Sequence, residues 1–207
     1  MKRVKYLILA AIILAAAVYF VYVNISLGEI KVIMLDPGHG ATDNGCSYAG
    51  VNEKDINYDI ALRTKDQLEQ LDYKVIFTHD DKEYVSPHGR SKLANRKGVD
   101  LYISIHQNAA ENSDAKGIEA WFSVRNPHSK RLAEAIQASL VDNTQAEDRG
   151  VKVTASLVVV RETKMPSVLI ECGFLSNPNE RESLADENYR QIIAESIAQA
   201  VEDFARN

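Results

Sequence analysis

The sequence predicts a single α/β domain in which helices flank a mostly parallel sheet of about six strands. Short apolar runs alternate along the chain with longer segments whose apolar residues recur at helical spacing. Of the 207 residues, 45% are apolar and 26% are charged, which is enough to bury one ordinary core. Strands that are apolar on both faces need helices on both sides, so the pattern indicates the α/β class.

The first part of the chain differs from the rest. Three basic residues within the first five precede a stretch without charge, residues 6–23, of about the minimum length for crossing a bilayer. We expect a transmembrane helix whose basic end stays in the cytosol and whose following domain lies on the extracytoplasmic face of the membrane. The alternative is a secretory signal peptide cleaved near the small residues 15–17. Residues 1–28 then form the anchor or signal peptide with a very short linker, and residues 29–207 form the folded domain.

The first half of this domain is predicted to alternate strands and helices. One short apolar run stops at Pro37-Gly38, as a buried first strand does, and Gly98 ends a helical stretch. Between them Ile56 and Ile60 lie one helical turn apart. The expected elements are a strand at 30–35, a helix over 56–71, a strand at 74–78, a helix over 86–97 and a strand at 100–105.

The second half gives fewer clear signals. An aromatic, β-rich segment is followed by Pro127, which suits the first turn of a helix. The final helix carries its apolar residues, including Ile193 and Ile197, on one stripe. The expected elements are a strand at 118–124, a helix over 127–142, strands at 157–161 and 168–172, and a helix over 189–205.

Charge and cysteine content exclude two classes of function. The net charge is −5 and the pI about 5.6, and the basic residues are scattered, so nucleic-acid binding is not expected. A zinc site built from cysteines is not expected either, because neither Cys46 nor Cys172 has a second cysteine two to four residues away. Whether these two cysteines form a disulfide is left open by the sequence.

Four residues point to a metal-dependent hydrolase. They are His39 in LDPGHG, Glu53 in NEKDIN, His106 in YISIHQN and Glu171 in VLIECGF. His39 and His106 follow strands, so they are expected at the carboxyl edge of the sheet, where open α/β sheets bind their ligands. Two imidazoles and one carboxylate suit Zn²⁺ with one position open, and the fourth residue would stand beside them as a proton-transfer group.

Each residue taken alone also has a structural explanation. His39 could be a solvent-exposed residue of a rigid turn. If it binds a metal instead, Asp36 could orient its ring by accepting the hydrogen bond of the other ring N–H. Glu53 lies where a helix begins, and a carboxylate there commonly complements the helix dipole. His106 follows a buried strand, where a histidine is often a hydrogen-bonded core residue.

Glu171 is the residue whose position most needs an explanation. It interrupts the apolar run 168–170, and an ionised carboxylate in a buried strand costs several kcal/mol unless it is paired or faces a polar site. A nearby cation would provide that partner. The alternative is an ion pair with Arg149 or Arg161.

The combined motifs resemble a known family. In their order along residues 31–205 they are LDPGHG, the E-K-x-x-N that begins at Glu53, the R-x-x-x-A-N that begins at Arg90, DLYISIH with Asn108, RGVK from Arg149, and MPSVLIECGFLSNPNE. This set resembles the zinc-dependent N-acetylmuramoyl-L-alanine amidases of the type-3 family. The resemblance implies hydrolysis of the amide between N-acetylmuramic acid and L-alanine in peptidoglycan.

The resemblance also implies roles for individual residues. His39, Glu53 and His106 are expected to bind Zn²⁺, and Glu171 is expected to be catalytic as the group that moves the proton. Asn108 and Arg149 are expected to contact the substrate.

Several positions depart from the family pattern. His79 stands where the family often has Arg, and Gln107 replaces a small residue after the second metal histidine. We expect His79, His88 and His128 to be solvated loop residues. Residues 109–116 are too few for the inhibitory helix of some relatives, so control is expected from expression or from an activating partner protein.

The small size of the chain leads us to expect a particular biological role. One anchor and one catalytic domain resemble the small membrane-anchored amidases that act on spore-cortex peptidoglycan ahead of germination. The alternatives are an amidase of general cell-wall turnover or cell separation, another zinc peptidase or deacetylase acting on peptidoglycan, and a catalytically silent peptidoglycan-binding module. The sequence does not determine the oligomeric state.

Overall fold

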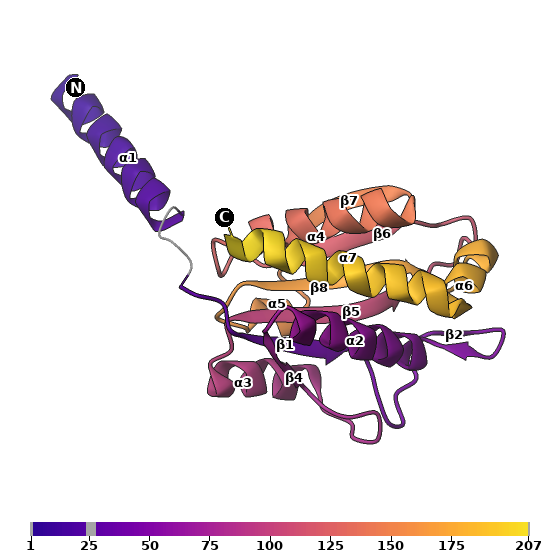
Figure 1. Cartoon of the computed structure of the whole chain (residues 1–207). Helices are drawn as coiled ribbons and strands as arrows, with labels where there is room; N and C mark the ends of the chain where they lie inside the picture. The colour runs from indigo at the N-terminus through magenta and orange to yellow at the C-terminus, as the bar shows by residue number, and fades with distance from the viewer. Residues whose placement is uncertain (1, 24–27, 207) are drawn as a thin grey trace.

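The computed structural model describes residues 2–23 and 28–206 (Figure 1). Helix α1 (Lys2–Val23) covers the predicted membrane segment, while most of the predicted linker lies outside the described residues. Within the described part of the chain, no helix is both long and apolar enough to cross a membrane. The transmembrane anchor therefore stays a prediction from the sequence.

The predicted mostly parallel sheet of six strands is confirmed. Strand β6 runs antiparallel to β8, and the other neighbouring strands of this sheet pair in parallel. Two short strands, β2 (Ser47–Tyr48) and β3 (Val51–Asn52), form a separate hairpin. In spatial order the six strands are β4 (Lys74–Phe77), β1 (Val32–Pro37), β5 (Leu101–Asn108), β8 (Ser167–Phe174), β6 (Ile118–Phe122) and β7 (Asp148–Val153).

Helices cover both faces of the sheet, as strands that are apolar on both faces require (Figure 1). Along β1, Ile33 and Leu35 belong to one apolar cluster and Met34 to the other, because successive side chains point to opposite faces. The first cluster packs under α2 (Glu53–Gln70), α4 (Ser129–Thr144) and α7 (Glu187–Arg206). The second cluster packs under α3 (Pro87–Lys97) and α5 (Val158–Arg161). The short helix α6 (Pro178–Ala185) lies between β8 and α7.

One predicted strand is wrong. Of residues 157–161, Val158–Arg161 form the short helix α5 and Leu157 precedes it as the N-cap residue, and the sixth strand of the sheet is β7 instead. A run of only four or five apolar residues has no periodicity that separates a strand from a buried helical turn. The Thr154 hydroxyl accepts hydrogen bonds from the backbone N–H groups of Ser156 and Leu157, which turns the chain before α5. Strand β7 was not predicted because its sequence, DRGVKV, is polar and half of its residues are exposed, so it lacks the apolar pattern of the other strands.

Local signals fixed other elements as expected. The Ser86 side chain accepts a hydrogen bond from the backbone N–H of Gly89 at the start of α3, Pro87 occupies its first turn, and Gly98 ends it with φ of 61°. Both cysteines, Cys46 and Cys172, are free thiols.

Candidate metal centre and catalytic site

A change from apolar to polar residues along one sheet face creates the candidate site. On the face covered by α3 and α5, Met34, Tyr102 and Leu169 belong to the buried apolar cluster. Two residues further along β1 and β8, on the same face, Asp36 and Glu171 are polar. The carboxyl ends of these parallel strands therefore present polar side chains together at one edge.

The turn after β1 places His39. Its φ is 67°, a left-handed conformation that few residues other than glycine adopt. The backbone N–H of Gly38 donates to the carbonyl of Ile105 over 2.8 Å, which ties the turn to β5. A Cβ atom at Gly38 would lie 2.3 Å from Cε1 of His106, so only glycine lets the turn approach this ring.

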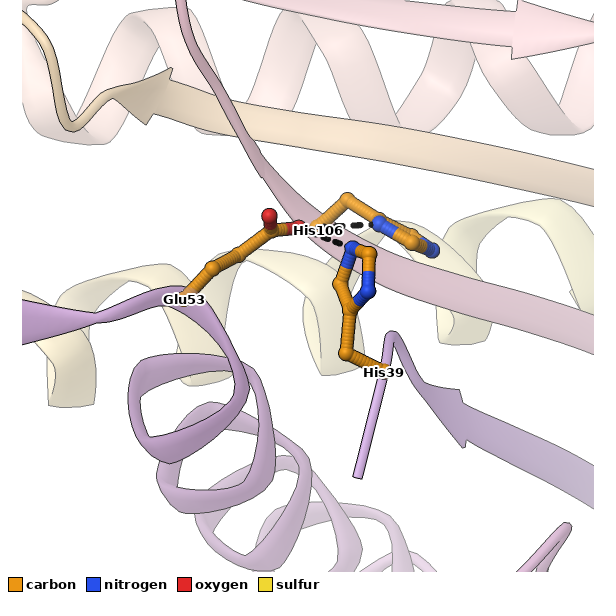
Figure 2. A group of neighbouring side chains, drawn as sticks. All are labelled: His39, Glu53 and His106. Atoms are coloured by element: carbon orange, nitrogen blue, oxygen red, sulfur yellow. Dashed lines mark hydrogen bonds and ion pairs between the residues drawn. The ribbon is translucent and has the colours of Figure 1, made fainter. Parts of the chain in front are cut away.

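Glu53 joins the two histidines (Figure 2). Its Oε1 lies 3.1 Å from Nε2 of His39 and 3.0 Å from Nδ1 of His106. Backbone N–H groups of Cys46 and Gln107 donate to the Glu53 carboxylate over 3.0 and 3.2 Å. The structure thus brings together three residues that are distant in sequence and come from the turn after β1, the start of α2 and the end of β5.

The three donor groups fit a zinc ion. One ligand atom from each of His39, Glu53 and His106 lies within 4.8 Å of the others. Two ligand atoms bound at about 2.0–2.1 Å to one tetrahedral centre lie roughly 3.3 Å apart, close to the two separations from the Glu53 oxygen. Nitrogen and carboxylate oxygen are donors that zinc accepts, and two imidazoles with one carboxylate make a known catalytic set.

Asp43, and not Asp36, orients the His39 ring. Nδ1 of His39 lies 2.9 Å from Oδ2 of Asp43, which leaves Nε2 to face Glu53. The expectation that Asp36 would do this is wrong. The fully buried Asp36 carboxylate instead accepts hydrogen bonds from Thr78, Arg90, Tyr102 and Ser104.

Arg90 connects that buried carboxylate to the turn. Its guanidinium donates to Asp36 Oδ1 over 3.0 Å, to the Pro37 carbonyl over 2.7 Å and to the His39 carbonyl. Burial opposes ionisation of Asp36, but the Arg90 charge and the hydroxyl donors outweigh it and lower the pKa of this carboxyl. Because Arg90 binds both Asp36 and the turn, Asp36 stabilises the turn that carries His39.

The charges of the centre depend on each other. Burial disfavours the charged form of His39, but its contacts with Glu53 and Asp43 outweigh burial and raise its pKa to about 9. Burial likewise opposes ionisation of Glu53, yet the two histidines hold the pKa of its carboxyl far below the usual range. The site therefore favours the ionised carboxylate of Glu53 and the protonated ring of His39.

Glu171 lies beside this centre without a partner. It pairs in register with His106 across β5 and β8, so both side chains lie on the same sheet face. Its buried Oε2 has no hydrogen-bond partner among the described residues. Burial raises the pKa of Glu171 to about 7. The alternative ion pairs do not form, because Arg149 contacts Glu119 and Arg161 contacts Glu162.

Asn108 and Arg149 meet around a residue that the sequence analysis missed. Glu119, on β6, accepts a hydrogen bond from Nδ2 of Asn108 over 3.1 Å and from Nε of Arg149 over 2.8 Å. It pairs in register with Glu171 across β6 and β8. A signal was present, because a charged residue interrupts the apolar strand GIEAWF just as Glu171 interrupts its own strand.

The other polar positions are placed as follows. His79 was expected in solvent, but it is buried, with ring nitrogens 2.7 and 3.0 Å from the carbonyls of Asp80 and Pro37. His88 is exposed, as expected, but it lies in the first turn of α3 and not in a loop, 2.8 Å from Glu162. His128 was also expected in solvent, but it is half-buried as the N-cap residue of α4, and burial lowers its pKa.

Fold and site define an α/β protein with a His-Glu-His candidate metal centre at the carboxyl edge of a mostly parallel sheet. Residues 33–203 match the family model described as N-acetylmuramoyl-L-alanine amidase. The chain belongs to this family.

Two curated relatives come from Bacillus subtilis (strain 168). N-acetylmuramoyl-L-alanine amidase LytC is 36% identical over 169 residues, which cover 81% of this chain and 34% of LytC. This chain thus spans about a third of the length of LytC. The germination-specific N-acetylmuramoyl-L-alanine amidase is 31% identical, and the match covers 83% of this chain and 78% of that protein.

Solved structures share the fold. The N-acetylmuramoyl-L-alanine amidase from Clostridium difficile 630 has a TM-score of 0.82 and 36% identity, covering 87% of this chain and 99% of that one. The CwlD amidase from Clostridioides difficile, solved in complex with the GerS lipoprotein, has a TM-score of 0.80 and 31% identity, covering 84% and 98%.

Proposed function

We propose that this protein is a zinc-dependent hydrolase that cleaves the amide between N-acetylmuramic acid and L-alanine in peptidoglycan. The observation that carries the proposal is that one ligand atom each of His39, Glu53 and His106 lie within 4.8 Å of one another, with the buried Oε2 of Glu171, which has no hydrogen-bond partner in the described part of the chain, beside them. Membership of the N-acetylmuramoyl-L-alanine amidase family supports the choice of bond.

The chain's own residues have separable tasks in this reaction. A zinc ion bound by His39, Glu53 and His106 would supply Lewis acidity that polarises the amide carbonyl and lowers the pKa of water. Glu171, with its pKa raised to about 7 by burial, takes a proton from the attacking water and delivers it to the leaving alanine nitrogen. Asp43 holds the His39 ring in the orientation that directs Nε2 into the centre.

Product identification tests the proposal directly. Purified peptidoglycan is digested with the zinc-loaded protein, and the fragments are analysed by mass spectrometry. The proposed reaction releases peptides with a free L-alanine amino group and glycan chains whose muramic acid carries a free lactyl carboxyl group. Loss of an acetyl group or of a terminal amino acid would instead identify a deacetylase or a peptidase. No products from zinc-loaded protein would favour the silent binding module.

We also propose a role in spore-cortex peptidoglycan and germination. Similarity to the germination-specific amidase of Bacillus subtilis supports this role, whereas similarity to LytC would equally suit general wall turnover or cell separation. In the producing organism, deletion of the gene should give spores that form but germinate poorly. Normal germination together with chained cells would favour cell separation.

An activating partner and an extracytoplasmic location belong to the same proposal. The CwlD amidase was solved with the GerS lipoprotein, which supports a search for a comparable partner of this chain. The charge-free residues 6–23 support a segment that directs or holds the domain outside the cytosol. Cell fractionation with an antibody to the domain distinguishes a retained membrane form from a secreted one, and a cytosolic pool alone would contradict both.

A further inference from the structure

A second charged cluster lies next to the candidate catalytic residue. Glu119 is buried and pairs in register with Glu171, so the two side chains lie on the same sheet face about 5 Å apart at Cβ. Its Oε2 contacts Nε of Arg149 and Nζ of Lys152, over 2.8 and 2.5 Å. Its Oε1 accepts hydrogen bonds from Asn108 and from the Trp121 indole N–H, over 3.1 and 3.0 Å.

This cluster holds more positive charge than its own stability requires. One cation would neutralise the buried Glu119 carboxylate, yet both Arg149 and Lys152 contact the same oxygen. Their side chains remain 32% and 33% exposed, while that of Glu119 is 5% exposed. The two cations therefore exceed the charge of Glu119 by one, and both keep part of their side chains exposed to solvent.

Both cations are held in place before any ligand arrives. The Arg149 guanidinium stacks 4.8 Å from the Phe174 ring centroid and donates to the Lys116 carbonyl over 3.2 Å. Lys152 lies with Nζ 5.2 Å from the Trp121 ring centroid. Fixed cations bind an anion at a smaller entropic cost than free surface side chains, because their rotamers are already ordered.

We propose that Arg149 and Lys152, anchored by Glu119, form a subsite that binds a carboxylate of the stem peptide on the alanine side of the scissile amide. This inference rests on the proposed amidase function, because cleavage at the muramoyl amide brings the stem peptide close to Glu171. In that substrate the N-acetylated sugars are uncharged, and the lactyl carboxyl group is consumed in the scissile amide. The remaining anionic groups therefore lie on the peptide.

The spacing matches such a substrate. With the scissile amide at Glu171, the first free carboxylate beyond alanine lies about two residue lengths away, roughly 7 Å. Neighbouring strands lie about 4.8 Å apart, so Glu119 on β6 stands about one strand spacing from Glu171 on β8, and both cations contact Glu119 from β7. A carboxylate on the second residue of the stem peptide can reach them while the amide stays at the centre.

The test uses two soluble probes that differ at one group. Both are N-acetylmuramoyl-L-alanyl-γ-D-glutamyl-L-lysine with an amidated C-terminus; in one the α-carboxyl of glutamate is free, and in the other it is a carboxamide. Binding to the full chain carrying Glu171→Gln is measured by calorimetry, so no turnover interferes. We expect the acid probe to bind about tenfold more tightly, as for a hydrogen bond to a charged group.

Variants test whether Lys152 and Arg149 cause the tighter binding of the acid probe. Lys152→Met, combined with Glu171→Gln, should reduce the acid preference several-fold, and adding Arg149→Gln should abolish it. Lys130→Met is the matched control, because Lys130 is an exposed lysine of α4 outside the site. Circular dichroism melting of each variant reports whether it is folded. Equal binding of the two probes, or a preference that survives the loss of both cations in folded protein, would overturn the subsite.

Turnover by the wild-type enzyme separates this inference from the proposed function. Cleavage of both probes with equal kcat/KM would leave the amidase function intact and refute the subsite. Cleavage of neither probe, with the acid preference in binding retained, would support the carboxylate subsite and refute the amidase function. We expect cleavage of both, with a lower KM for the acid probe.

Discussion

At the residue scale, Glu171 combines a buried carboxylate oxygen without a partner and a position opposite His106. Glu171→Gln keeps the size of the side chain but cannot accept a proton. We expect activity to fall by about 10²- to 10⁴-fold while the bound zinc content stays the same. Product release from peptidoglycan and metal analysis of the same preparation check this. Near-normal turnover in the zinc-loaded variant would remove Glu171 from the proposed mechanism.

Asp43 is expected to act on the metal through His39. Asp43→Asn weakens the contact that sets the ring orientation, so zinc affinity should fall by about 10- to 100-fold. Competition with a chromogenic chelator measures this affinity. Asp66→Asn, at an exposed acidic residue of α2 outside the site, is the control and should leave affinity unchanged. An unchanged affinity in the Asp43 variant would show that the ring is oriented by packing alone.

Asp36 is expected to make stability depend on pH. Its folded-state pKa is lowered below the ordinary 3.8, so its contribution is fully present above about pH 4 and is lost as the pH falls through the folded value. Asp36→Asn leaves the buried Arg90 without its counter-charge and should cost about 3–5 kcal/mol in the free energy of unfolding at pH 7.

Urea unfolding at several pH values checks the Asp36 prediction. The difference between wild type and variant should narrow below about pH 4. Thr78→Val removes one neutral donor to the same carboxylate but keeps its charge, and it should cost less, about 1.5–3 kcal/mol. A difference for Asp36→Asn that stays constant from pH 7 to pH 3 would contradict the role of its charge.

At the scale of elements, α3 is delimited by signals in its own sequence. Gly98 ends it in the left-handed conformation, and a Cβ there would meet open space. Gly98→Ala should therefore destabilise the protein by about 1–2 kcal/mol through backbone strain alone. Gly98→Asn, which tolerates this conformation better, should cost less. Thermal unfolding ranks the two variants, and equal losses would indicate a cause other than the backbone angle.

The elements also show where sequence patterns stop being sufficient. The long helix α7 has enough turns for its apolar stripe to be recognised, and α3 has both caps. Helix α5 has four residues, too few for a period, and β7 exposes half of its residues at the sheet edge. Short elements take their conformation from their neighbours, which a pattern along the chain does not contain.

At the scale of the whole molecule, zinc should stabilise the fold because its three ligands come from separate parts of the chain. Zinc at about 100 times its Kd should add about 2.7 kcal/mol to the free energy of unfolding. Calorimetry should show a higher Tm with zinc and its reversal by a chelator. In His39→Ala the shift should disappear, and a shift that persists would place the metal elsewhere.

The sequence by itself determined the α/β class, most helices and strands, and the four residues proposed for the metal site and proton transfer. Apolar periodicity, helix caps and polar residues within apolar strands are local features that can be recognised along the chain. Only the tertiary structure decided which groups meet: Asp43 rather than Asp36 at His39, His79 in the interior, and Glu119 beside Glu171. The physical reason is that strand order and register bring together residues far apart in the chain, and no local pattern encodes that pairing.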